Sequence, residues 1–426
     1  MKRKPWRLWL APLKADLENK RLERIVTEMK KFKLLFLAGI TAAMLVGCGE
    51  SDEEAVVGIS IEKLEDVAPV EVEATTEATV VEEVNEDLPP HEGMVRSYFT
   101  NEWVEESTNT NRPLAVMYPI NKEAQPQYGL SNVAVFYEIM EEGSMSRQMG
   151  ILEDWQNLDR IGNIRSIRDY FIYAALEYDP IVVHYGGPEL YVKGVLNGSN
   201  RPEGKDDVDN LNGVGGVMGS DYGAFFRVPE GSTSEHTAFT DGAHVSSAIE
   251  KAGFSATHRD QFEGQAHFKF AGTTEPNTLA DYPDAVDATE INMAASFPVT
   301  KSALSYDPEK EVYLKTLYGS AQKDAVTGEQ LAFSNVIIQR TYHEVRDDNG
   351  YLAYQMHDTT RDGYFITKGK MIHVTWEKKA DYDPTTYYDD NGEEITLNTG
   401  KTMIFVIQEK GGSFSKFDVN GVTYAE

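Results

Sequence analysis

The stretch DYFIYAALEYDPIVVHYGG, residues 169–187, decides how this chain folds. Its first part, residues 169–178, places apolar side chains at helical spacing. Pro180 ends that helix, because proline lacks the N–H group that another helical turn would need. Its second part, residues 181–185, is a short β-branched run that leads into two glycines, as a buried strand does when it enters a loop. A helix followed at once by a buried strand predicts a mixed α and β architecture.

The residues on either side continue this alternation. Residues 241–252 predict a helix that Asp241 caps and Gly253 terminates. Residues 197–224 are rich in Gly, Asn and Asp and predict a long surface loop. We therefore expect a mixed α/β domain over residues 93–299. Two further apolar runs predict buried strands in it: residues 113–118 (PLAVMY) and 133–138 (VAVFYE).

From about residue 300 the pattern changes to short β-type runs separated by turns. Strands spaced roughly ten residues apart predict a mainly antiparallel, β-rich domain over residues 300–426, smaller than the first. The expected fold class is therefore α+β, a mixed α/β N-terminal domain followed by a mainly antiparallel β C-terminal domain. The strand candidates are residues 336–338, 351–356, 363–367, 371–376 and 402–407. The turn candidates are residues 348–350 (DNG), 361–363 (RDG) and 390–392 (DNG).

Residues 29–48, MKKFKLLFLAGITAAMLVGC, are typical of a bacterial lipoprotein signal peptide. Lysines precede an uncharged apolar segment that is shorter than the ~20 residues needed to span a bilayer. The closing Gly-Cys pair resembles a lipobox, where a peptidase cleaves and the cysteine receives diacylglycerol. We expect residues 29–47 to be removed and Cys48, the single cysteine, to be lipidated, which excludes disulfide bonds within the chain. Residues 1–28 do not fit a signal peptide, and we interpret them as an extension from a misassigned start codon, with Met29 as the true start.

Residues 48–92 predict an acidic, disordered tether. After Cys48 this segment holds 15 Asp and Glu, one Lys and no aromatic residue, and such a composition cannot offset chain entropy by burial. The whole chain of 426 residues has a formal net charge of −29. Residues 1–47 hold 11 Lys and Arg and 4 Asp and Glu, so the mature form would carry −36. So negative a chain is a poor candidate for nucleic-acid binding, which needs clustered cations.

A series of distinctive motifs follows the tether in a fixed order. The first are RPLAVMY (112–118), QYGLS (127–131), RIGNIRSIRDYF (160–171), VHYGG (183–187) and EHTAFT (235–240). The later ones are FSNVIIQ (333–339), GYFITKGKMIHVTW (363–376) and YYDDNGEEITLNTGKT (387–402). Together they resemble the YerB-like bacterial lipoproteins, a two-part domain family of unknown function, over about residues 93–410. The resemblance implies an extracytoplasmic lipoprotein of a Gram-positive-type bacterium, connected with the cell wall, and supplies no catalytic residues.

An arginine-rich stretch is the leading candidate for a ligand site. Arg165 and Arg168 are three residues apart, so on a helix they would share a face and present two guanidinium groups to one carboxylate or phosphate. Arg160 and Asp169 belong to the same stretch. The alternative is that the arginines pair internally with acidic residues, namely Glu138, Glu141, Glu142 or Asp169.

A second candidate group surrounds the glycine pair of the opening stretch. His184 would lie at a strand end facing Gly186 and Gly187, a position that often holds ligands in α/β folds. The alternative is a hydrogen-bonded core histidine. His236 is a further candidate. Asp241 and His244 are three residues apart, as a metal-binding pair on a helix face would be, but no third ligand lies at a fitting spacing, so we expect neither a metal site nor a cofactor.

These features favour a non-enzymatic, lipid-anchored envelope protein on the outer face of the cytoplasmic membrane. Its predicted partners are the membrane, through diacylglycerol on Cys48, and a wall-associated protein or an anionic wall fragment such as peptidoglycan. The sequence lacks the Gly-x-Ser-x-Gly and His-Glu-x-x-His catalytic motifs, and a lipidated cysteine cannot act as a nucleophile. The alternative is a hydrolase or transferase acting on peptidoglycan or another envelope glycan, through a cleft with His184 or His236 and a nearby Asp.

Overall fold

The computed structural model describes residues 88–202, 206–229, 234–410 and 412–425. The predicted extension, the signal peptide, Cys48 and the tether up to residue 87 lie outside the described residues. Within the ranges that are described, no helix is both long and apolar enough to cross a membrane.

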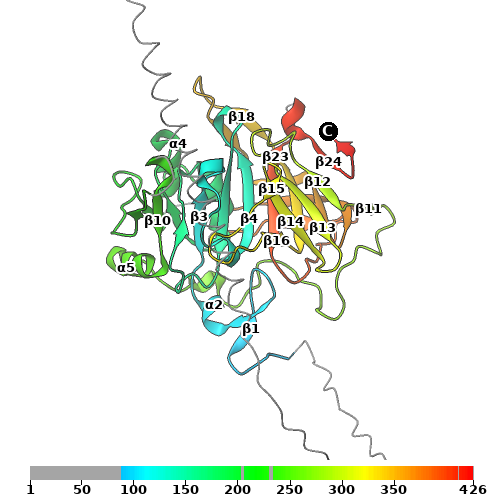
Figure 1. Cartoon of the computed structure of the whole chain (residues 1–426), viewed down its shortest axis with the longest axis horizontal. Helices are drawn as coiled ribbons and strands as arrows, with labels where there is room; N and C mark the ends of the chain where they lie inside the picture. Colours follow the sequence, from blue (N-terminus) through cyan, green and yellow to red (C-terminus); the bar gives the residue numbers. More distant parts are fainter. Residues whose placement is uncertain (1–87, 203–205, 230–233, 411, 426) are drawn as a thin grey trace, which may run out of the picture. The chain divides into compact units, whose positions relative to one another are not determined.

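A large mixed sheet runs through the described part of the chain (Figure 1). Its central strand β23 pairs in parallel with a neighbour on each side, and its last three strands are also parallel, whereas the other pairings are antiparallel. In spatial order the strands are β11 (Val286–Asp287), β21 (Lys370–Lys378), β20 (Asp358–Thr367), β17 (Asn335–Thr341), β23 (Thr402–Gln408), β4 (Val133–Met140), β5 (Ser146–Leu152), β3 (Leu114–Tyr118), β7 (Ile181–His184) and β8 (Asn210–Asn212), with β22 (Thr386–Tyr388) beside β21.

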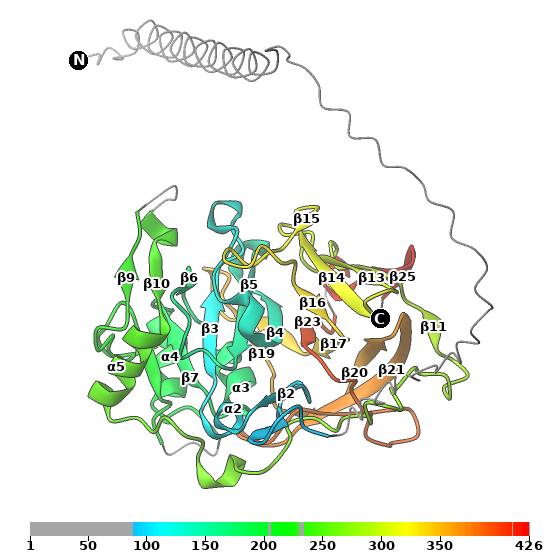
Figure 2. The same ribbon diagram turned by 60° about the horizontal axis from the view of Figure 1, so that its bottom comes forward.

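The strands β3, β4 and β7 form because their sequences are nearly continuous apolar runs. Every residue in them is buried, as expected for a sheet that is covered on both faces. Helix α3 (Asp169–Leu176) packs on β4, and the hydroxyl of Tyr170 donates to the carbonyl of Met140 at 2.9 Å. Figure 2 shows helix α5 (Gly242–Ala252) and the long strands β20 and β21 on opposite sides of the described part.

A second, antiparallel sheet packs on the large sheet at β4. Phe136 on β4 stacks on Phe333 with ring centroids 6.2 Å apart, and Glu138 on β4 forms a fully buried ion pair with Lys315 at 3.0 Å. The strands of this sheet are β15 (Ser320–Ala321), β14 (Val312–Leu317), β13 (Ala303–Asp307), β12 (Glu290–Asn292), β24 (Phe417–Val419) and β25 (Val422–Tyr424), with β16 (Ala332–Phe333) beside β14.

The predicted fold class is confirmed: helices and a mixed sheet occupy the N-terminal region, and antiparallel strands dominate the C-terminal region. The boundary near residue 300 stays a prediction. Strands from both sides of it share the large sheet, because β23 lies between β17 and β4. The expected loop over residues 197–224 is wrong in part, because β8 within it pairs with β7.

The remaining elements are short. The helices are α2 (Glu106–Thr110), α4 (Glu189–Leu196) and α5 (Gly242–Ala252). The small strand groups are β1 (Met94–Arg96) with β2 (Trp103–Glu105), β6 (Ile161–Gly162) with β10 (Ala238–Thr240) and β9 (Phe226–Arg227), and β18 (His343–Val345) with β19 (Leu352–Tyr354). The 3-10 turns are η1 (Lys122–Ala124), η2 (Leu130–Asn132), η3 (Glu142–Ser144), η4 (Ser234–His236), η5 (Asp260–Phe262) and η6 (Gly412–Ser415).

Candidate functional site

The segment that carries the predicted arginines runs along the carboxyl ends of β3 and β7. The amide of Arg165 donates to the carbonyl of Met117 at 2.9 Å, and the carbonyl of Arg165 accepts from the amide of Tyr185 at 2.9 Å. The amide of Ile167 donates to the carbonyl of Gly186 at 3.0 Å. The arginine segment and the glycine loop, predicted separately, are therefore neighbours at one edge of the sheet.

His236 joins them through a small sheet. Strand β10, which follows the η4 turn, pairs antiparallel with β6, and Phe239 lies opposite Gly162. Asn163 donates from its side-chain amide to the carbonyl of His236 at 2.9 Å. This pairing holds His236 close enough to Arg165 for that charge, together with burial, to lower the pKa of the imidazole.

Arg165 and Arg168 do not share a helix face. Helix α3 begins only at Asp169, and Arg168 is the extended residue that precedes it. The Arg168 side chain is buried and donates to Glu142 at 3.0 Å, and its guanidinium also lies 3.1 Å from Glu141. Although burial lowers the pKa of Arg168, these two carboxylates raise it further, so its charge is held and neutralised within the fold. The internal-pairing alternative therefore describes Arg168.

Arg165 is less completely paired. Its guanidinium donates to the carbonyl of Glu235 at 3.2 Å and contacts that residue's carboxylate at 3.3 Å, and the Glu235 side chain is 67 % exposed. Arg147, on β5, lies near: it donates to the carbonyl of Ser166 at 3.2 Å and pairs with Glu141 at 2.5 Å. Burial and the charge of Arg147 lower the pKa of Arg165.

Three nitrogens in this region are buried without a hydrogen-bond partner among the described residues. They are Nε of Arg147, Nε of Arg165 and Nδ1 of His236. Buried donors are nearly always satisfied in folded proteins, so a group of unsatisfied nitrogens needs an explanation such as a bound ion or water. We call Arg147, Arg165 and His236 the Arg165 cluster.

His184 and the two glycines have structural contacts. His184 is fully buried, its Nδ1 donates to the carbonyl of Gly186 at 2.9 Å, and its Nε2 lies 3.2 Å from Oδ1 of Asn210. Burial lowers the pKa of His184 by more than its contacts with Gly186 and Asn210 raise it. Gly186 has φ of +80°, and a Cβ on Gly187 would lie 2.9 Å from the carbonyl oxygen of Ile167. The glycines therefore let the arginine segment approach the loop.

The side chains of Arg160 and Asp169 are engaged outside the Arg165 cluster. Arg160 lies over the rings of Tyr128 and Phe239, at 4.8 and 5.6 Å from their centroids. Asp169 forms an ion pair with Arg346 at 2.5 Å, in the connection between β18 and β19. Burial raises the pKa of the Asp169 carboxyl.

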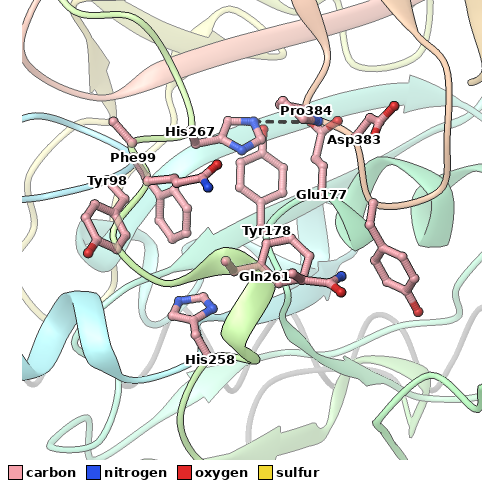
Figure 3. A pocket seen from close by; sticks show the side chains of 13 residues that line it. Tyr98, Phe99, Glu177, Tyr178, His258, Gln261, His267, Asp383 and Pro384 are labelled. Carbon is pink, nitrogen blue, oxygen red and sulfur yellow. Dashed lines mark ion pairs between the residues drawn. The ribbon is translucent and has the colours of Figure 1, made fainter.

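The sequence interpretation missed a pocket at the other end of α3, with a volume of about 350 Å³ (Figure 3). Its lining comes from four separate segments, around residues 98–99, 177–178, 258–267 and 382–384. His267 stacks on Tyr178 with centroids 4.1 Å apart, and its Nε2 lies 3.6 Å from Glu177. One signal was present in the sequence: Glu177 is the only charged residue between Asp169 and Asp179.

Glu177 is an ionised, well-partnered carboxylate. Burial raises its pKa, but Lys378 and His267 outweigh burial and hold the pKa well below the usual range. Lys378 donates to Glu177 at 2.9 Å, and Thr385 donates from both its amide and its hydroxyl, at 2.9 and 2.7 Å. Burial raises the pKa of Tyr178, so that phenol stays neutral.

Among the described residues, no group of three or more His, Cys, Asp or Glu side chains is arranged to hold a metal ion.

Comparisons with known proteins match most of the chain. The model "Protein of unknown function (DUF3048) N-terminal domain" matches residues 99–255, and the corresponding C-terminal domain model matches residues 293–404. "Putative lipoprotein YerB" of Bacillus subtilis is 24 % identical over 308 residues, which is 71 % of this chain and 80 % of that protein. The crystal structure of the YerB protein from Bacillus subtilis has the same fold, with a TM-score of 0.60 and 22 % identity, covering 74 % of this chain and 96 % of that one.

Proposed function

This chain belongs to the DUF3048 family, and from that membership we propose that it is a lipid-anchored envelope protein that binds an anionic, wall-associated ligand at the Arg165 cluster. The relative described as a lipoprotein supports an anchor, and Cys48 is the residue that would carry it. The protein would stand on the outer face of the cytoplasmic membrane of a Gram-positive-type bacterium. The acidic residues 48–92 would keep it away from anionic headgroups, because like charges repel.

The observation that carries this proposal is the set of three unsatisfied buried nitrogens in the Arg165 cluster. A carboxylate or phosphate oxygen accepts hydrogen bonds from guanidinium nitrogens with favourable geometry and charge. Glu235 would compete only weakly with such an anion for Arg165, because its carboxylate is exposed and an exposed ion pair contributes only about 0–1 kcal/mol. An incoming anion would therefore displace Glu235 at little cost.

A substitution of Arg168 would not test this function cleanly, although the sequence analysis named Arg168 together with Arg165. Removing its charge would leave Glu141 and Glu142 partly unpaired and would destabilise the fold. Arg165 is the residue to change, because its side chain is partly exposed and its one carboxylate partner is at the surface.

The test uses the full chain, purified in detergent, with inorganic phosphate and isolated cell walls as probes. We expect Arg165→Gln to weaken phosphate binding at least about tenfold, since a hydrogen bond to a charged group contributes roughly 1.5–3 kcal/mol. Isothermal titration calorimetry measures the phosphate affinity, and co-sedimentation measures retention on walls.

Arg160→Gln is the matched control, because it removes the same charge from an arginine that stacks on Tyr128 and Phe239 outside the cluster. It should leave both readouts near the wild-type values. Equal losses in the two variants, or a wild-type chain that binds neither probe, would contradict the proposal.

The alternative of a hydrolase or transferase on envelope glycans requires a histidine that reaches substrate. His184 is fully buried with both ring nitrogens near other polar atoms, and Nδ1 of His236 has no hydrogen-bond partner among the described residues, so no Asp orients that ring as a general base would require. The geometry therefore supports ligand binding better than it supports catalysis by either residue.

A further inference from the structure

We propose that the pocket between Phe99, His258, His267 and Tyr382 binds a neutral sugar ring, such as a hexose or an N-acetylhexosamine. This site lies at the carboxyl end of α3, whereas the Arg165 cluster adjoins the segment before the same helix. It is therefore independent of the anion site. Its volume of about 350 Å³ lies within the roughly 300–1,000 Å³ range of small-molecule pockets.

The pocket walls are mostly aromatic. One group consists of Phe99, Tyr178 and His267, in which Phe99 meets Tyr178 edge-on at 5.4 Å. A second group consists of Phe262 and Tyr382, which meet edge-on at 6.1 Å. Aromatic faces carry partial negative charge, and the C–H groups on one face of a sugar ring carry partial positive charge, so the two surfaces attract.

The charges buried around the pocket are already compensated. Glu177 is neutralised by Lys378 at 2.9 Å. Asp179 behind His258 is neutralised by Arg259 at 2.6 Å and by Arg112 at 3.5 Å. In the buried part of the pocket a charged ligand would lose its hydration without gaining an unpaired counter-charge, which is costly in a low-dielectric site. Asp383 also lines the pocket, but it is exposed to solvent, where its attraction for a cation is weak. The pocket therefore favours a ligand that is polar but uncharged.

Polar groups stand where the hydroxyl or amide groups of a sugar would need partners. Nε2 of His267 is buried and makes no hydrogen bond among the described residues, although it lies 3.6 Å from the carboxylate of Glu177, and the His267 side chain is 4 % exposed. Gln261, which Figure 3 labels, and Gln265 both line the pocket and are exposed to solvent. An amide both donates and accepts, which suits neutral hydroxyl groups.

In the test, the full chain in detergent at pH 7 is titrated with four monosaccharides, and their binding is measured by saturation-transfer NMR and by calorimetry. Glucose and N-acetylglucosamine are neutral, glucosamine is cationic and glucuronic acid is anionic. We expect the neutral sugars to bind more tightly than both charged sugars. We expect Phe262→Ala to weaken binding about fivefold, since an aromatic contact contributes roughly 0.5–1.5 kcal/mol.

Two further variants keep the test decisive. Gln261→Ala changes an exposed side chain, so it should fold, and it should weaken binding about threefold through loss of a neutral hydrogen bond. Phe254→Ala, at a half-buried ring that packs on Tyr222 outside the pocket, should leave binding unchanged. A preference for a charged sugar, no binding of either neutral sugar, or equal losses in Phe262→Ala and Phe254→Ala would each overturn the proposal.

Discussion

The carboxyl of Glu153 has an unusual proton affinity for a residue that belongs neither to the Arg165 cluster nor to the lining of the aromatic pocket. Burial raises its pKa from 4.5 to about 7, although Ser97 donates to it at 2.8 Å. Between those two pH values the folded chain keeps a proton that the unfolded chain releases, so raising the pH favours unfolding. The stabilisation is full below about pH 4.5 and is lost as the pH rises through about 7, and it amounts to at most about 3 kcal/mol.

We therefore expect Glu153→Gln to be more stable than the wild type at pH 8 and to lose less stability between pH 4.5 and 8. Urea unfolding at a series of pH values measures the difference. Glu263→Gln, at an exposed position, should follow the wild-type profile. A Glu153→Gln profile parallel to that of the wild type would refute this assignment.

At the same scale, the sequence named Glu141 and Glu142 among the alternative partners of the arginines, but it named no partner for His184. Arg168 contacts Glu142, and His184 contacts Asn210, through chain segments that only the folded sheet brings together. The expectation of a shared helix face failed for a local reason, because helix α3 begins only at Asp169 and Arg168 is extended. Local spacing carries no information about contacts between distant segments. Glu177 and His267 were missed for that reason, since the pocket draws on four separate segments.

Helix α5 shows which element-level features the sequence does encode. Asp241 caps it by accepting from the amide of His244 at 2.7 Å, and Gly253 ends it with φ of +74°, as predicted. Gly242, the first helical residue, has a role that local pattern did not reveal. A Cβ there would lie 2.0 Å from the carbonyl oxygen of Gln156.

Gly242→Ala should therefore destabilise the fold by about 1–3 kcal/mol, the usual range for overpacking a close contact. In a helix, alanine is normally more favourable than glycine by about 0.5–1 kcal/mol, so a loss of stability in Gly242→Ala would indicate the close contact and not helix propensity. Thermal unfolding measures it. Gly272→Ala is the control, because its Cβ would have its nearest neighbour at 4.0 Å, and a loss no larger than in that variant would argue against the contact.

Two element-level predictions failed because tertiary pairing outweighed local composition. Residues 361–363 have the composition of a turn but lie inside β20. Gly363 serves close packing there, since a Cβ would lie 3.0 Å from the carbonyl oxygen of Ile338. Strand β8 forms in a loop-like sequence because its backbone can pair in parallel with the edge of β7.

At the scale of the whole molecule, Glu138 and Lys315 tie the two regions together. Both are fully buried, and the carboxylate also accepts from Ser302 at 2.7 Å and Ser146 at 2.7 Å. Burial raises the pKa of Glu138, but Lys315 and the hydroxyl donors lower it further, so the pair is ionised. The sequence predicted the strand over residues 133–138. It could not predict that Glu138, the last of these residues, pairs with a lysine from another sheet.

Lys315→Met should destabilise the protein by about 3–5 kcal/mol, because it leaves a carboxylate buried without its counter-charge. Adding Glu138→Gln to that variant should recover part of the loss. Lys310→Met, at an exposed position between β13 and β14, is the control. Denaturation followed by circular dichroism and by tryptophan fluorescence should give one coincident transition, and a Lys315→Met variant as stable as the control would contradict this role.

The position of β23 in the large sheet also determines when that sheet can form during folding. Strands β4 and β17 both pair with β23, which follows β4 by more than 260 residues along the chain. In a chain exported in an extended form, the sheet cannot close until β23 has also crossed the membrane. Until then the apolar edges of β4 and β17 stay open, so the emerging chain depends on prompt completion or on a chaperone to avoid aggregation.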